Sequence, residues 1–112
     1  MKIAIPLTSG VLSSHFGHCE QFAIIDTDPQ AKKILSNEVV TPPPHEPGLY
    51  PKWLAERGAT HIIAGGMGQS ARSLFEQNKI AVIVGAPSET PDKIVSRYLE
   101  GMLVTGENCC DH

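Results

Sequence analysis

The segment from residue 13 to residue 19 concentrates side chains that bind metals. It reads Ser-Ser-His-Phe-Gly-His-Cys and places His15, His18 and Cys19 within five residues. Imidazole suits zinc, copper, iron and nickel, whereas a cysteine thiolate selects soft metals and metal–sulfur clusters. The spacing matches no standard zinc motif, and the alternative is that one histidine caps a turn while Cys19 is a small buried side chain. We interpret all three residues as candidate metal ligands.

A second group of donors stands at the end of the sequence, which reads Asn-Cys-Cys-Asp-His. Cys109, Cys110 and His112 together supply three donors for a soft or borderline metal. Chain ends are usually frayed, so the alternative is a tail whose thiols have no role. Adjacent thiols in such a tail would be prone to oxidation unless they were bound to something. The Cys-x-x-Cys spacing of redox proteins is absent, which favours metal binding over a redox pair.

A third candidate is a glycine-rich loop, Gly65-Gly66-Met67-Gly68, between a strand-like and a helix-like segment. The free N–H groups and the dipole of a helix N-terminus attract anions, and glycine lets a bulky ligand approach the backbone. The loop is neither a dinucleotide-binding pattern nor a P-loop, so a tight turn that requires glycine is the competing interpretation. His45, in a proline-rich connector before a helix, is expected at the same end of the sheet.

The elements that position these residues can be read from the apolar pattern. The three strand-like segments at the start of the chain predict an antiparallel meander, and alternating helices and strands follow the proline-rich connector. Gly58 is expected to cap the first helix, and Ser88 is expected to cap the last, with Pro91 in its first turn. The resulting order, βββαβαβα, predicts an α/β fold with a mixed sheet of about five strands and helices on its faces. The expected strands are residues 2–7, 22–28, 31–40, 61–64 and 80–84, and the first helix is residues 49–57.

Bulk composition narrows the function classes. The chain has 112 residues, 41% of them apolar and 19% charged, which indicates one globular domain over residues 1–112. The net charge of −3 and scattered basic residues argue against a nucleic-acid partner. No apolar run is long enough to span a membrane, and the start of the chain lacks a signal-peptide pattern, so we expect a cytoplasmic protein. Three cysteines, an odd number, disfavour a disulfide framework.

Four segments together resemble the dinitrogenase iron–molybdenum cofactor biosynthesis family. That family includes cofactor carriers of the NifX and NafY type, the C-terminal domain of NifB and the small orange protein that carries a molybdenum–copper sulfide cluster. The resemblance covers nearly the whole chain, and its most specific feature is His15-Phe16-Gly17 combined with the later glycine-rich loop. The four segments are Lys2–Pro6, Ser14–Cys19, Leu54–Gly58 and Ile62–Gly68.

The resemblance implies a ribonuclease-H-like fold and the binding of an anionic metal–sulfur cluster of molybdenum, iron or copper with sulfide, without catalysis. It also implies cluster-assembly or acceptor proteins as partners. The Cys109-Cys110-Asp111-His112 ending is not a defining motif of the family, and its assignment depends on ligand chemistry alone. The implied cluster-binding residues are His15, Phe16, Gly17, His18, Cys19, His45, Gly65, Gly66, Met67 and Gly68.

Three other functions remain to be weighed. A ribonuclease-H-like nuclease needs clustered carboxylates for two metal ions, and Asp26 and Asp28 alone are too few. A thiol-based redox or metal-trafficking protein would use Cys19 with the two tail cysteines to move copper or zinc. A protein-interaction module would need no metal. For the cluster carrier, we expect the segment 13–19, the glycine-rich loop and the C-terminal tail to converge at one end of the sheet.

Overall fold

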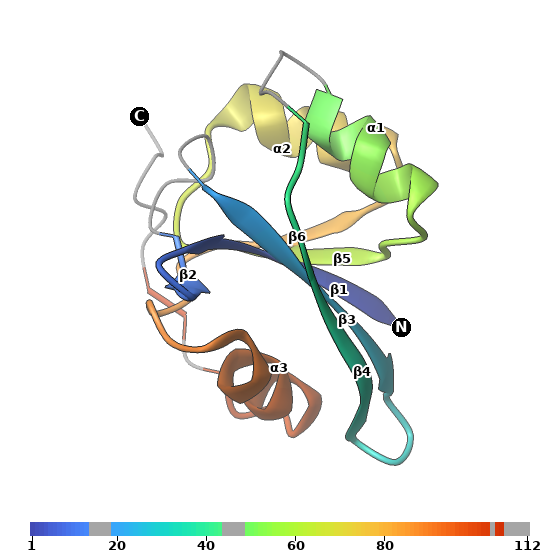
Figure 1. Ribbon diagram of the computed structural model, residues 1–112, viewed down its shortest axis with the longest axis vertical. Helices are drawn as coiled ribbons and strands as arrows, with labels where there is room; N and C mark the ends of the chain where they lie inside the picture. The colour runs from blue at the N-terminus through green and yellow to red at the C-terminus, as the bar shows by residue number, and fades with distance from the viewer. Residues whose placement is uncertain (14–18, 44–48, 104, 107–112) are drawn as a thin grey trace.

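The computed structural model of the chain describes residues 1–13, 19–43, 49–103 and 105–106. A six-stranded mixed sheet lies at its centre, with strands in the order β4-β3-β1-β5-β6 and the short β2 paired to β1. Helices α1 and α2 cover one face of the sheet and α3 covers the other (Figure 1). The strands are β1 (Lys2–Thr8), β2 (Val11–Leu12), β3 (Gln21–Asp28), β4 (Lys33–Val40), β5 (His61–Ile63) and β6 (Ala81–Ile83). The helices are α1 (Leu49–Glu56), α2 (Gln69–Gln77) and α3 (Pro91–Leu99).

The long strands β1, β3 and β4 form the expected antiparallel meander, in which β3 pairs with both of its neighbours. The predicted strand count and order need a correction, because β2 lies in a segment that we expected to be loop. Ser9 and Gly10 both have positive φ, at 54° and 82°, and this tight turn folds Leu12 back opposite Leu7. The described sheet therefore has six strands, four of which precede the first helix. The ribonuclease-H-like classification stays a prediction.

The second half of the sheet is parallel. Ala4 of β1 pairs with Ile62 of β5, and Ile62 pairs with Val82 of β6, so the helices between them act as crossovers. The carboxyl ends of these three strands therefore share one edge of the sheet, which we call the carboxyl edge.

The end of α1 and the start of α3 are set by the backbone conformations that glycine and proline favour. Gly58 has the predicted capping role: its φ is 84° and its N–H donates to the Ala55 carbonyl at 3.0 Å, with Ala59 donating to Leu54. The expected cap at Ser88 is wrong, because Thr90 is the N-cap of α3. Pro91 takes the first helical position, where its fixed φ fits and its missing N–H costs nothing, so the cap is the residue immediately before it.

Two apolar layers hold the helices on the sheet, and β1 contributes to both. Ala4 faces α1 and α2, whereas Ile3 and Ile5 face α3, as strand alternation requires. The first layer centres on Phe22 and Phe75, both fully buried, and the second contains Ile94 and Val95 of α3. None of the helices in the described ranges combines the length and the apolar character that a membrane crossing requires.

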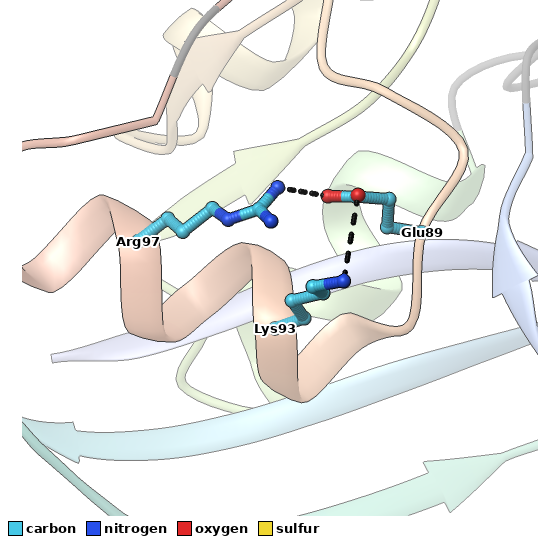
Figure 2. A network of polar contacts seen from close by, with 3 residues as sticks. All are labelled: Glu89, Lys93 and Arg97. Carbon is cyan, nitrogen blue, oxygen red and sulfur yellow. Dashed lines mark hydrogen bonds and ion pairs between the residues drawn. The ribbon is translucent and has the colours of Figure 1, made fainter.

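Glu89 joins the loop after β6 to α3, as Figure 2 shows, and its backbone also contacts β2. Its carboxylate accepts a hydrogen bond from Arg97 and lies 3.8 Å from the Lys93 ammonium. Its backbone carbonyl accepts the Leu12 N–H at 3.0 Å. The loop that carries the chain from β6 to α3 is thereby fixed to the residues that follow β1.

Candidate functional site

The candidate site lies at the carboxyl edge of the sheet. In open α/β sheets, ligands bind outside the carboxyl ends of the parallel strands. β1 ends at Thr8, β5 at Ile63 and β6 at Ile83, so the loops that follow them open at this edge. The start of β3 and the start of α2 lie on the same side of the molecule, at the left of Figure 1.

The glycine-rich loop leaves β5 and leads into α2. Gly65, Gly66 and Met67 are buried, and Gly68 is partly exposed. Gly68 has φ −69° and ψ 160°, an extended conformation that any residue can adopt, and a Cβ built there meets no atom of the described residues within 4 Å. Neither backbone strain nor crowding therefore requires glycine at position 68. The competing interpretation, a turn that needs glycine, does not account for this residue, and open space lies beside the backbone at the start of α2.

The first turn of α2 attracts negative charge. Its first helical hydrogen bond runs from the Arg72 N–H to the Gly68 carbonyl at 3.1 Å. The N–H groups of residues 69–71 consequently have no partner within the helix. No side-chain hydrogen bond within the described part of the chain caps this end, and no acidic residue stands in the first turn. The positive end of the helix dipole thus faces the edge without a compensating carboxylate from its own turn.

Two buried polar atoms at this edge have no hydrogen-bond partner among the described residues, Thr8 Oγ1 and Arg72 Nε. Strand alternation places Thr8 on the same face of β1 as Ala4, the face that α1 and α2 cover. Arg72 lies three residues before the buried Phe75, on the same side of α2. A buried polar group without a partner costs about 1–3 kcal/mol, so an anionic ligand at this edge would relieve that cost.

Among the candidate metal ligands in the segment 13–19, Cys19 is the one that the structure describes. It is half-buried just before β3 and packs against the apolar layer that contains Phe22 and Met67. Burial raises the pKa of the Cys19 thiol from 9.0 to about 11, and a backbone hydrogen bond opposes this rise only in part. The thiol is therefore neutral near pH 7. It can ligate a metal only by losing its proton, which a bound cation would promote.

Tyr50 is a residue of this site that the sequence analysis missed. It belongs to the first turn of α1, is 4% exposed, and packs edge-on against Phe22 with ring centroids 5.3 Å apart. Burial raises the pKa of its phenol, and charge on Cys19 raises it further. Cys19 packs against the same apolar layer to which Tyr50 belongs. One signal could have identified it, namely an aromatic residue in the first turn after the proline-rich connector.

The described part of the C-terminal segment also reaches this edge. The Gly106 N–H donates to the Gly85 carbonyl at 2.7 Å, and the Gly85 N–H donates to the Gly65 carbonyl at 3.0 Å. The tail is thus joined through Gly85 to the glycine-rich loop, as the expected convergence requires of these two parts. His61 lies at the opposite end of its strand, where its Nδ1 pairs with Thr60 Oγ1 at 2.8 Å.

Most of the predicted ligands fall outside the described residues. Within the described ranges, no three His, Cys, Asp or Glu side chains gather closely enough to hold a metal ion. The structure therefore places Cys19 and the glycine-rich loop, and the remaining assignments stay predictions. The residues outside the description are His15, Phe16, Gly17, His18, His45, Cys109, Cys110 and His112.

The fold defines a mixed α/β protein whose crossover loops open at one edge of the sheet. The chain belongs to the dinitrogenase iron–molybdenum cofactor family, whose sequence pattern matches residues 1–101. The resemblance inferred from the sequence is thereby confirmed. The matched region includes β1, the segment 13–19 and the glycine-rich loop, and it ends before the C-terminal tail.

Individual relatives agree with this assignment. The chain is 32% identical over 106 residues to the uncharacterised protein MJ0580 of Methanocaldococcus jannaschii, with 92% of this chain and 89% of that protein covered. The crystal structure of PH0822 superposes with a TM-score of 0.86 at 26% identity, over 94% of each chain. The apo form of the orange protein from Desulfovibrio gigas shares the fold, with a TM-score of 0.72 at 23% identity over 96% of this chain and 93% of that one.

Proposed function

We propose that the protein binds and carries an anionic metal–sulfur cluster at the carboxyl edge of its sheet, without catalysing a reaction on it. The observation that carries the proposal is the start of α2. Open space beside Gly68, an uncapped helix N-terminus and the unpartnered Arg72 Nε occur together there. They lie on the edge to which Cys19 and the described tail also belong. The family is named for a cofactor of this chemical kind, which supports the same conclusion.

The residues of the edge suit such a cargo in different ways. The amides at the start of α2 and the Arg72 guanidinium offer hydrogen bonds and positive charge to cluster sulfides, which are anionic acceptors. Met67 and Phe22 supply an apolar wall that limits water access and so tunes a bound cluster. Cys19 offers a sulfur ligand once its proton leaves. His15, His18 and His45 are proposed as further ligands or hydrogen-bond donors, on the evidence of their residue type and the family pattern.

A carrier role, with no turnover, follows from the same chemistry. Hydrolases need a nucleophile, a base within hydrogen-bond reach and a group that orients the base. Among the described residues of this edge, Cys19 is the one strong nucleophile type, and its high pKa suppresses the thiolate at neutral pH. The edge offers positive hydrogen-bond donors and soft ligands, which hold a preformed anion. The proposed partners are therefore the proteins that deliver the cluster and accept it.

The proposal is tested by loading the purified protein anaerobically with thiomolybdate, a soluble anion of molybdenum and sulfide, in the presence of cuprous ion. Retained visible absorbance and metal are measured after desalting. We expect R72M to reduce the retained cluster at least several-fold, because it removes the positive charge and the unpartnered Nε–H at the start of α2. R97M is the matched control, because Arg97 pairs with Glu89 on the opposite face of the sheet. Equal uptake by both variants and the parent would contradict the assignment of this edge.

Gly68 provides a second test at the same edge. G68S fills the open space but introduces a favourable N-cap side chain, so the cargo-free protein should be at least as stable as the parent. We expect it nevertheless to take up less thiomolybdate. Unchanged uptake by G68S would show that the space beside the helix start does not receive the cargo.

A further inference from the structure

The outer edge of β4 is unpaired within the described part of the chain. β4 stands at one end of the strand order β4-β3-β1-β5-β6 and bonds on one side only, to β3. Its eight residues therefore present a row of backbone N–H and C=O groups outward. The strand at the other edge, β6, has three residues and offers a much shorter row. A long unpaired edge is a template for another strand, and the side chains of β4 decide which strand it accepts.

Exposed apolar side chains lie along this edge strand. Leu35 and Val39 are 63% and 50% exposed, and Met102 is the other large apolar side chain that is exposed among the described residues. Val39 and the exposed Asn37 pair with residues of β3 that face α3, so both point to that face of the sheet. Strand alternation places Leu35, two residues before Asn37, on the same face. Ile34 packs against the layer beneath α3, but the next three residues on this face, which we call the β4 stripe (Leu35, Asn37 and Val39), remain exposed.

The β4 stripe is symmetric about Asn37, so it is complementary to a second copy of itself. Antiparallel pairing centred on Asn37 places Leu35 of each copy opposite Val39 of the other. On the reverse face of the strand, Ser36 then lies opposite Glu38 of the second copy, where the hydroxyl donates to the carboxylate. Each apolar or hydrogen-bonded pair occurs twice, as a two-fold interface requires.

The charges of β4 favour the same arrangement. Lys33 begins the strand and Glu38 stands near its end, so antiparallel copies place the basic end of one beside the acidic end of the other. A parallel, in-register pair would place each charge opposite itself, which destabilises a sheet. Centring an antiparallel pair on Glu38 would likewise oppose two carboxylates, and centring it on Ser36 would place Val39 opposite Lys33. The register centred on Asn37 avoids both of these pairings.

The edge is only partly protected against such pairing. A register shift against β3 leaves Leu35 as an extra residue, a β-bulge of the kind that natural edge strands use to avoid association. The bulge lies near the start of the strand, however, and residues 36–40 pair with β3 without interruption. β4 also contains no proline, the other common protection of an edge. The regular part of the strand therefore keeps an edge that a second copy can extend.

We propose that two copies of the protein associate by antiparallel pairing of β4 with β4, centred on Asn37, and form one continuous sheet. Val40 at the end of β4 pairs with Phe22 near the start of β3, next to the carboxyl edge. Antiparallel pairing turns the two carboxyl edges toward opposite ends of the joined sheet, so each stays open. One strand pair is smaller than the standard interface of about 1,600 Å², so the dimer is weak and dilute protein is monomeric.

Self-association is measured by sedimentation equilibrium over a range of protein concentrations. We expect a monomer–dimer equilibrium in the parent. V39E and L35K should each raise its dissociation constant about tenfold or more, because a charge replaces one member of an apolar pair that occurs twice. The double variant L35K/V39E should recover most of the parent affinity, because the register then sets the new ammonium opposite the new carboxylate.

M102E is the matched control for these substitutions. Met102 is 67% exposed and lies outside β4, so M102E should leave the dissociation constant unchanged. An equal effect of M102E and V39E would overturn the proposal. So would a parent that stays monomeric at millimolar concentration, or a double variant that associates no better than V39E.

The register is tested by oxidative cross-linking in a C109S/C110S background. N37C places the new thiols directly opposite each other, with Cα atoms about 4.5–5.5 Å apart, a separation that a disulfide spans. K33C is the matched control on the same strand. Lys33 faces Thr41 of the second copy in this register, so the two thiols of K33C would stand roughly 26 Å apart along the strands. We expect a covalent dimer from N37C and at most a trace from K33C, and equal cross-linking of the two would overturn the register.

The pairing and the carrier function fail in distinguishable ways. Leu35 and Val39 face α3, whereas the start of α2 lies on the opposite face of the sheet, so V39E should retain as much thiomolybdate as the parent. A parent that dimerises but retains no thiomolybdate would remove the carrier function and leave the pairing standing. A parent that retains thiomolybdate but stays monomeric would overturn the pairing and leave the edge to a strand of another protein.

Discussion

Cys19 and Tyr50 share one apolar layer at the carboxyl edge, although Cys19 precedes β3 and Tyr50 lies in the first turn of α1. Burial raises the pKa of both groups, and charge on Cys19 raises that of Tyr50 further. A thiolate at Cys19 therefore favours the protonated phenol of Tyr50. Near pH 7 the cargo-free edge therefore holds a neutral thiol and a neutral phenol.

We predict that Cys19 reacts slowly with alkylating reagents. In a C109S/C110S variant it is the only thiol, and at pH 8 a pKa of about 11 leaves a thiolate fraction roughly 100-fold below that of a thiol at the ordinary 9.0. The more basic thiolate is also the better nucleophile, so iodoacetamide should react about 10- to 100-fold more slowly than with the urea-unfolded chain. The rate should still be rising with pH above 9. A plateau that begins near pH 9 would show an unshifted thiol.

His61 should make the stability of the protein depend on pH. Burial lowers its pKa below the ordinary 6.5, and the positive N-terminus lowers it further. The unfolded chain therefore takes up this proton at a higher pH than the folded chain. The contribution of neutral His61 to stability is present above pH 6.5 and is lost as pH falls through the folded pKa.

Urea unfolding of the parent and of H61Q between about pH 7.5 and 5 measures this contribution. We expect the parent to lose more unfolding free energy over this range than H61Q, because the variant lacks the titrating group. Parallel pH profiles for the two proteins would contradict the assignment.

Gly58 should be costly to replace. It adopts φ 84° at the end of α1, a conformation that is strained for residues with a side chain. G58A is expected to lower the unfolding free energy by about 1–2 kcal/mol, measured by chemical denaturation. G68S serves as the matched control, because Gly68 has negative φ and open space around it, and it should cost nothing. Equal losses in the two variants would show that the positive φ of Gly58 carries no special cost.

Phe75 should dominate the stability of the layer beneath α1 and α2. Its side chain is fully buried, so F75A should cost about 3–5 kcal/mol through lost burial and a cavity. Leu35 of the edge strand β4 is 63% exposed, and L35A should change the unfolding free energy by less than about 0.5 kcal/mol. The account of the core would be wrong if the two substitutions had similar effects.

Much of the architecture could be predicted from sequence because single-residue signals were strong. Alternating apolar residues predicted the meander, and Gly58 predicted the end of α1. The strand β2 was not predicted because a strand of two residues is too short to show an alternating pattern. Its formation depends on the turn made by Ser9 and Gly10, both with positive φ. The cap at Thr90 was missed because serine and threonine are both good caps, and the choice between them was decided by the position of Pro91.

Fewer residues of the candidate site than of the fold could be predicted from the sequence, because part of the site depends on tertiary packing. The residue types cysteine, histidine and glycine by themselves indicate metal binding or close backbone approach, so Cys19 and the glycine-rich loop could be selected as candidate site residues. Arg72 and Thr8 matter because their polar atoms are buried without partners, which is a property of tertiary packing alone. Gly85 and Gly106 gave no motif, because their relationship spans two segments that only the fold brings together.

The central claim is that this edge holds an anionic metal–sulfur cluster, and the most direct measurement is on protein purified from its native organism without oxygen. Metal content, acid-labile sulfide and the visible spectrum are determined together on the same sample. The account predicts molybdenum, iron or copper together with sulfide, and the loss of both in an R72M protein purified in the same way. A colourless, metal-free protein that also fails to take up thiomolybdate would contradict the account, and an interaction module without metal would then be the better description.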